Sequence, residues 1–189
     1  MLSNLIMNSK DFNKLADGLY LINHKVFNDQ RGTFKIISNS DMLPFLIDEK
    51  FNSIQTNIVE SKKNVFRGLH FQINDAAQSK IVTVLDGSIT DYVIDLRSKS
   101  KTFLKLFKIE ISNLSNFSIF ISKGFAHGYF VKSNSSSVEY NIDHNYNKEL
   151  ERTINYNSTN INLPIDNPLC SDKDEEGLSL QEYLLNNKF

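Results

Sequence analysis

The stretch that decides the fold reads Lys80-Ile-Val-Thr-Val-Leu85, then Asp86-Gly87, then Ser88-Ile-Thr-Asp-Tyr-Val-Ile-Asp95. β-Branched and aromatic residues dominate both arms, and these residue types favour strands. The Asp-Gly dipeptide between the arms tolerates the positive φ of a tight turn. The stretch therefore predicts two antiparallel strands joined as a hairpin.

Further strand-like runs follow on the C-terminal side of this stretch. Residues 106–112 and 117–121 are two expected strands. Residues 125–132 and 138–142 flank a Ser/Asn cluster at 133–137, which is typical of another hairpin. Many short strands between turn clusters indicate an all-β protein, either a sandwich or a barrel.

Helix-forming patterns occur towards the two ends of the chain. Residues 40–47 predict a short helix interrupted by Pro44, and the leucines and tyrosine of residues 178–185 predict a last helix. The length of 189 residues suits a single domain over residues 1–189, with short flanking helices at the termini.

Composition narrows the classes of partner and compartment. The net charge of -1 predicts no nucleic acid and no anionic membrane as partner. Cys170 is the single cysteine, so an intramolecular disulfide is excluded. The N-terminal residues 1–10 lack the pattern of a signal peptide, and no apolar run is long enough to span a bilayer. We expect a cytoplasmic protein.

Residues that could take part in catalysis or ligand binding gather in three segments. In Arg67-Gly-Leu-His-Phe-Gln72, strand alternation would place His70 on the face of Gly68, which leaves space before the imidazole, and Arg67 on the opposite face. Spacing alone favours a half-buried histidine satisfied by a backbone carbonyl. His127 also lies beside glycines on an expected strand, and the acidic residues at 171–174 are of a kind that is most often solvated.

Six segments together resemble the signature of the dTDP-4-dehydrorhamnose 3,5-epimerases, in the order and at the spacing found in that family. The resemblance implies a cupin, or jelly-roll, β-barrel whose subunits pair as a homodimer, and an epimerase that needs neither a metal nor another cofactor. The segments are Phe27-Asn-Asp-Gln-Arg-Gly32, Arg67-Gly-Leu-His-Phe-Gln72, Asp95-Leu-Arg97, Gly124-Phe-Ala-His-Gly128, residues 140–151, and Ser171-Asp-Lys-Asp174.

The same resemblance implies roles for individual residues. His70 corresponds to the family's base and Asp174 to the carboxylate that orients it, while Tyr140 corresponds to the acid and Lys80 to a cation near the ketone oxygen of the sugar. The substrate is a dTDP-linked 4-keto-6-deoxy sugar, and the core at about 18–165 is completed by a C-terminal segment, 166–189. The implied substrate contacts are Arg31, Gln55, Asn57, Arg67, His127, Tyr146, Glu151 and Lys173.

Other functions stay open at this point. An epimerase acting at C3 only or C5 only, in another deoxysugar pathway, would keep the same residues. A non-catalytic cupin that binds a sugar nucleotide is a second alternative. A metal-dependent cupin is disfavoured, because Gln72 stands where a second histidine ligand would follow His70. Ile36 stands where the family usually has a glutamate, which leaves the identity of the nucleoside open.

Overall fold

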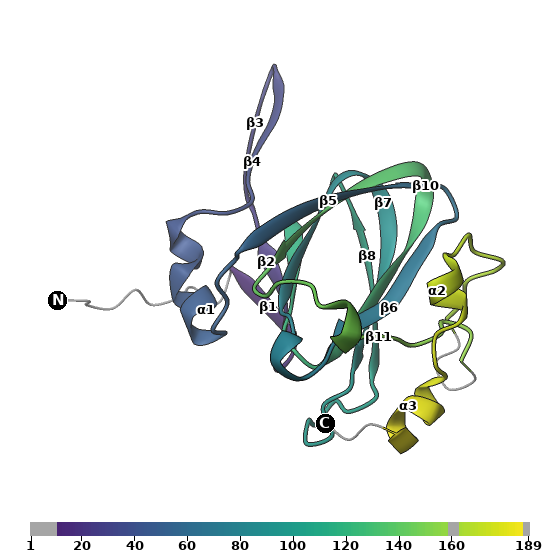
Figure 1. Ribbon diagram of the computed structural model, residues 1–189. Coiled ribbons are helices and arrows are strands. Elements are labelled where there is room, and N and C mark those ends of the chain that lie inside the picture. The colour runs from purple at the N-terminus through teal and green to yellow at the C-terminus, as the bar shows by residue number, and fades with distance from the viewer. Residues whose placement is uncertain (1–10, 159–162, 187–189) are drawn as a thin grey trace.

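The computed structural model describes residues 11–158 and 163–186, and strands dominate it (Figure 1). The all-β prediction is confirmed. In chain order the strands are β1 (Phe12–Ala16), β2 (Leu19–Asn23), β3 (Lys25–Asp29), β4 (Gly32–Ile36), β5 (Gln55–Lys62), β6 (Phe66–Gln72), β7 (Lys80–Asp95), β8 (Leu106–Ser112), β9 (Phe117–Ile121), β10 (Phe125–Ile142) and β11 (Glu151–Thr153). The α-helices are α1 (Leu43–Asp48), α2 (Asp172–Glu175) and α3 (Leu180–Asn186), and 3-10 turns are Ser40–Met42, Asn74–Ala76 and Lys148–Leu150.

Two long antiparallel strands, β7 and β10, organise the main sheet. The first half of β7 pairs with β9 and its second half with β8, while β10 pairs with β6 through its first half and with β5 through its second half. Both strands therefore belong to two layers, one running β1-β2-β9-β7-β10-β5 and the other β8-β7-β10-β6-β11. The sheet is sandwich-like and is not closed into the expected barrel.

The prediction of a hairpin at Asp86-Gly87 is wrong. Strand β7 continues through this dipeptide, and its register with β10 shifts between Ser137 and Val138, as in a β-bulge. Gly87 has φ +77°, and a Cβ there would lie 2.1 Å from the carbonyl oxygen of Ser135. A glycine with positive φ serves a bulge as well as a turn, so the local sequence does not distinguish the two.

The second predicted hairpin, at 133–137, is also a bend within a continuous strand. Strand β10 runs through this cluster, and its register with β7 shifts between Val131 and Ser136. The hydroxyl of Ser133 accepts a hydrogen bond from the backbone N–H of Ser88 at 2.8 Å. The irregular parts of β7 and β10 thus lie side by side, and together they fold the sheet into its two layers.

The other predicted elements are present. The strands expected at 106–112 and 117–121 are β8 and β9, and the last helix is α3. The helix expected near the N-terminus is α1, but Pro44 lies in its first turn and does not interrupt it. Proline suits that position because the first helical N–H groups have no partner within the helix.

Apolar side chains fill the space between the layers and cover both outer faces. Val82 of one layer and Val93 of the other belong to the same buried cluster between them. Outside, α1 packs Phe45 onto the layer of β9, and α3 packs Tyr183 onto the layer of β6. No helix in the described parts of the chain is long and apolar enough to cross a membrane. The β3–β4 hairpin projects away from the sandwich (Figure 1).

Candidate active site

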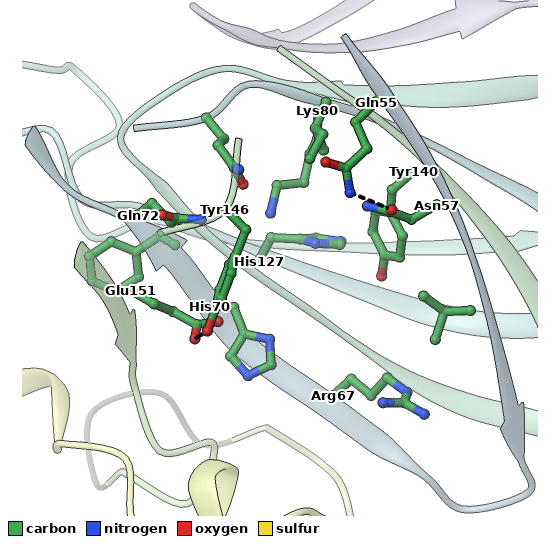
Figure 2. Close-up of a pocket in the computed structure, with 14 residues that line it drawn as sticks. Gln55, Asn57, Arg67, His70, Gln72, Lys80, His127, Tyr140, Tyr146 and Glu151 are labelled. Carbon is green, nitrogen blue, oxygen red and sulfur yellow. Dashed lines mark hydrogen bonds between the residues drawn. The ribbon is translucent and has the colours of Figure 1, made fainter. Parts of the chain in front are cut away.

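A cavity of about 500 Å³ opens between the two layers (Figure 2). Strands of both layers contribute to it, so its walls come from segments far apart in the sequence. Nine of the residues predicted to act on or bind the substrate line this cavity: Gln55, Asn57, Arg67, His70, Lys80, His127, Tyr140, Tyr146 and Glu151.

A β-bulge in β6 brings Arg67 and His70 to the same face. Arg67 lies opposite Tyr129 and His70 lies opposite His127, so two residues of β6 face the single residue between them on β10. The prediction that strand alternation separates Arg67 from His70 is therefore wrong. The extra residue resets the alternation, and both side chains reach the cavity.

The glycine at position 68 has a different role from the one predicted. Its missing side chain faces Gly128 of the neighbouring strand, and a Cβ on Gly68 would lie 2.5 Å from the Cα of Gly128. Gly68 also has φ +130°, which side chains rarely allow. The glycine therefore permits the bulge and the close approach of two strands, and does not open space before the imidazole.

The imidazole of His70 is paired with a carboxylate from the C-terminal segment. Its Nε2 lies 2.5 Å from Oδ1 of Asp174, and the two residues are 104 positions apart. Asp174 belongs to α2, whose N-terminus is capped by the hydroxyl of Ser171. Burial alone would raise the pKa of Asp174, but the hydrogen bond with His70 holds it below its usual value. This carboxylate is therefore ionised near neutral pH and holds the ring in place.

Tyr140 comes from the other layer and faces the same cavity. Figure 2 shows its ring on one side of the cavity with the imidazole of His70 on another. Burial of the phenol raises the pKa of Tyr140 well above its ordinary value, while the positive charge of Arg67 acts in the opposite direction. Tyr140 is consequently protonated at neutral pH and can give a proton to a bound molecule.

The amine of Lys80 points into the same cavity (Figure 2). Burial lowers the pKa of Lys80 to about 8, although Asp91, Glu151 and Asp143 each favour its charged form. The lysine is thus a cation at neutral pH and loses that charge under mildly alkaline conditions.

The reading of the sequence missed Asp91, which forms a second histidine–carboxylate pair. Oδ2 of Asp91 lies 2.7 Å from Nε2 of His127, and both side chains are almost fully buried. Burial lowers the pKa of His127, against the attraction of Asp91. An available signal was the acidic residue within the apolar run Ile89–Ile94, where alternation places Asp91 on the inner face with Val93.

Three predicted substrate contacts form a chain at the rim of the cavity. The Tyr146 hydroxyl donates a hydrogen bond to Glu151 at 2.7 Å, and the amine of Lys173 lies 2.6 Å from the other oxygen of that carboxylate. Lys173 does not line the cavity itself. Because it precedes Asp174 on α2, the chain connects the rim to the carboxylate behind His70. On the opposite wall, the Gln55 side chain donates to Asn57 at 2.7 Å.

Arg31 does not lie in the cavity. It sits at the tip of the β3–β4 hairpin, where its side chain is 84% exposed and pairs with Asp29 at 2.6 Å. The structure therefore does not bring Arg31 together with the other predicted substrate contacts of its own chain.

The described residues contain no group of three or more His, Cys, Asp or Glu side chains arranged to hold a metal ion. The imidazoles of His70 and His127 each bind one carboxylate, so the donor set of the cavity consists of separate histidine–aspartate pairs.

The family profile described as dTDP-4-dehydrorhamnose 3,5-epimerase matches residues 14–182. The chain belongs to the dTDP-4-dehydrorhamnose 3,5-epimerase family. A member of this family from Shigella flexneri is 37% identical over 155 residues, which cover 81% of this chain and 86% of that relative. The resemblance predicted from the six sequence segments is confirmed.

Solved structures of dTDP-4-dehydrorhamnose 3,5-epimerases share the fold. The enzyme from Sulfolobus tokodaii has a TM-score of 0.80 and 39% identity, with 90% of this chain and 95% of that chain covered. The Legionella pneumophila dTDP-6-deoxy-D-glucose-3,5-epimerase, solved with dTDP-4-keto-L-rhamnose, has a TM-score of 0.82 and 31% identity, with 89% and 91% covered. These matches confirm the predicted cupin-type fold.

Proposed function

We propose that the protein inverts C3 and C5 of a nucleoside-diphosphate 4-keto-6-deoxyhexose, converting dTDP-4-keto-6-deoxyglucose to dTDP-4-dehydrorhamnose. One observation carries the proposal: His70 and Tyr140, from different layers of the sandwich, line the same cavity with Lys80. Family membership supports this choice of substrate.

The reaction begins with removal of a proton beside the ketone. A proton on C3 or C5 is acidic because its loss gives an enolate. The imidazole of His70 takes this proton, and the Asp174 carboxylate orients the ring and stabilises the imidazolium. The ammonium of Lys80 stabilises the negative oxygen at C4. The base thus works without leaving its hydrogen-bonded position.

Inversion is completed by a proton from the opposite face of the sugar. The Tyr140 phenol gives its proton to the enolate carbon. Before the next proton is abstracted, the phenolate takes a proton from solvent and the His70 imidazolium releases one to solvent. Since both C3 and C5 flank the same ketone, one base and one acid serve both centres after a change in the placement of the sugar. This residue set requires no cofactor in the proposed cycle.

The nucleotide part of the substrate would lie at the rim. Tyr146 presents an exposed ring on which a thymine base can stack, and Gln55 and Asn57 offer amide groups. The guanidinium of Arg67 suits an oxygen-rich anionic group. Lys173 and Glu151 hold this rim next to the pair formed by His70 and Asp174.

The proposal includes a homodimer in which Arg31 serves the cavity of the partner subunit. The hairpin that carries Arg31 also exposes the rings of Phe27 (57%) and Phe34 (65%), which a subunit contact would cover. Arg31 does not line the cavity of its own chain, and in this proposal it contacts the substrate bound by a second subunit. We further place the reaction in the cytoplasm, in synthesis of rhamnose for surface polysaccharides such as the O-antigen of lipopolysaccharide.

The decisive experiment incubates the protein with dTDP-4-keto-6-deoxyglucose in deuterium oxide and determines the configuration and isotope content of the product by NMR. We expect inversion and one deuterium at each of C3 and C5. Deuterium at a single inverted carbon would identify an epimerase of C3 only or C5 only. A folded protein that exchanges neither proton would be a non-catalytic binder.

The dimer proposal has its own test, which uses two inactive variants. His70→Ala lacks the base, and Arg31→Ala lacks the residue supplied across the interface. In a mixed dimer of the two, one cavity holds both an intact His70 and an intact Arg31. We expect activity to return on mixing; its absence in demonstrated mixed dimers would show that Arg31 does not act across subunits.

A further inference from the structure

Two glutamines, Gln72 and Gln78, line the cavity without a role in the proposed reaction. Both bind the backbone of residues 143–147, the rim segment. The side-chain nitrogen of Gln78 donates a hydrogen bond to the carbonyl oxygen of His144 at 2.6 Å. The side-chain oxygen of Gln72 accepts a hydrogen bond from the backbone N–H of Asn147 at 2.9 Å. The two side chains thus hold the rim segment at two points.

The middle of the rim segment lies beyond the pairing of the sheet. The ladder between β10 and β7 ends with a backbone hydrogen bond from Asp143 to Ser79. In the described part of the chain, no backbone hydrogen bond joins Asn145 or Tyr146 to a strand. The exposed ring of Tyr146 is held by the bond from its hydroxyl to Glu151. The position of this ring therefore also depends on the two glutamine bonds, which lie on either side of it in the chain.

The chemistry of the two bonds determines which end of each amide is used. A backbone N–H can only donate, so Gln72 offers its oxygen to Asn147. A carbonyl oxygen can only accept, so Gln78 offers its nitrogen to His144. One site needs an acceptor and the other needs a donor, and a hydrocarbon side chain of the same shape can make neither bond.

Packing alone does not explain an amide at the end of β6. Gln72 is only 6% exposed, and burying an amide costs free energy unless it is hydrogen-bonded. An apolar side chain would fill this place without that cost. Figure 2 shows Gln72 and Tyr146 on the side of the cavity away from Gln55 and Asn57. The buried amide is thus explained by its bond to the rim segment.

The strands that carry the proposed base and cation also place the two glutamines. Gln72 follows His70 on β6, with one residue between them, and Gln78 precedes Lys80, the first residue of β7, at the same spacing. The rim segment is therefore fixed relative to the groups that act on the sugar. A nucleotide bound at the rim would have a defined position relative to its sugar.

We propose that Gln72 and Gln78 are positioning residues for the nucleotide, which hold the rim segment so that the ring of Tyr146 stacks on the base of a bound nucleoside diphosphate. This role rests on the proposed function. Neither glutamine takes part in proton transfer. Loss of either bond leaves the ring less often in the position for stacking, which weakens binding without slowing the chemical step.

The main test measures the binding of dTDP to Gln72→Met and Gln78→Met by isothermal titration calorimetry. Methionine keeps the length of glutamine and lacks its amide. Each dissociation constant should rise about fivefold, the factor that corresponds to one typical hydrogen bond, and KM for the keto sugar nucleotide should rise equally with kcat unchanged. Gln181→Met makes the same change on the exposed surface of α3 and should bind like the wild type. Unchanged dissociation constants in both cavity variants would overturn the proposal.

A double variant tests whether the effect acts through the stacking ring. Adding Gln72→Met or Gln78→Met to Tyr146→Ala should weaken the binding of dTDP no further, because the ring that the two bonds position is already absent. If the fivefold loss persists in this background, the glutamines act on another part of the site and the proposal is wrong.

A measurement without ligand separates this proposal from the proposed function. The amide N–H of Asn147 should exchange with deuterium oxide several times faster in Gln72→Met than in the wild type, as followed by NMR. Gln72→Glu should keep the slow exchange, because a carboxylate also accepts the bond. Equal exchange in Gln72→Met and the wild type would contradict the proposal. A wild type that binds dTDP without epimerising the sugar would defeat the proposed function alone, whereas one that binds no dTDP would overturn both.

Discussion

The two histidine–aspartate pairs of the cavity have similar contacts and very different surroundings. His70 and Asp174 lie 2.5 Å apart, and the imidazole keeps 31% of its side-chain surface exposed. His127 and Asp91 lie 2.7 Å apart, but that imidazole is only 3% exposed. A group that must take up and release protons needs access to the substrate and to solvent. The comparison therefore separates a pair suited to proton transfer from a pair suited to holding the cavity's shape.

The origin of the two carboxylates differs as well. Asp91 comes from β7, within the sandwich, and its charge also faces Lys80. Asp174 comes from α2, a short helix laid against β6 by the C-terminal segment. One pair is consequently part of the core, whereas the other is assembled only when the end of the chain docks.

The largest expected effect comes from removing the more exposed imidazole. His70→Asn should lower solvent exchange at C3 and C5 by about 10²–10⁴-fold, the usual contribution of a general base. The matched variant His127→Asn should retain more activity, because that ring is not expected to exchange protons with substrate. Proton exchange followed by NMR gives both rates. Substantial exchange in folded His70→Asn would show that another group is the base.

Next in size is the loss of the carboxylate charge behind each ring. Asp174→Asn should reduce kcat by on the order of 10²–10⁴-fold, since an amide neither fixes the same tautomer nor stabilises an imidazolium. Asp91→Asn should reduce kcat less. Steady-state kinetics of the two variants, with circular dichroism to check folding, tests this order. Equal losses would mean that both pairs take part in proton transfer.

A smaller effect concerns pH. The pKa of Lys80 is about 8, so the rate should fall above that pH as the ammonium becomes neutral. Lys80→Arg should move this alkaline limb to higher pH, because arginine stays charged. Asp91→Asn should move it to lower pH by removing a charge that favours protonated Lys80. The pH profile of kcat for the wild type and the two variants tests these expectations. If the alkaline limb does not shift in Lys80→Arg, the titration of another group causes it.

The smallest effect is on stability in acid. Because burial lowers the pKa of His127, the unfolded chain binds a proton near pH 6.5 that the folded chain binds only at lower pH. The unfolded state therefore holds more protons in that window, and stability falls as the pH decreases through it. His127→Gln should lessen this dependence. Urea unfolding at several pH values measures how the free energy of unfolding depends on pH. If that dependence is the same in His127→Gln and in the wild type, His127 is not buried in its neutral form.

Much of the fold followed from local patterns. The runs at 106–112 and 117–121 are strands with those same bounds, and α3 lies where the leucines near the C-terminus predicted a helix. The two hairpins predicted around Gly87 and 133–137 are bends in continuous strands. Turn-forming residues indicate that the chain changes direction locally. Whether that change is a full reversal or a bend within one strand depends on the strands that pair with it.

For the candidate site, the resemblance predicted the residues, and the structure shows which of them lie together. Nine predicted residues share one cavity, and Asp174 joins them through His70. Asp91 was overlooked because it does not belong to the segments that carried the resemblance. Arg67 and His70 were assigned to opposite faces because strict alternation does not anticipate a bulge.

The sequence by itself determined the all-β class and the family, since residue types and the order of its motifs do not depend on coordinates. Only the tertiary structure decided which side chains meet: a one-residue bulge in β6 turned Arg67 towards His70, and docking of α2 supplied Asp174. The physical reason is that an extra residue in a strand turns the side chains that follow it to the opposite face of the sheet. Contacts between distant segments also depend on the packing of the whole sheet.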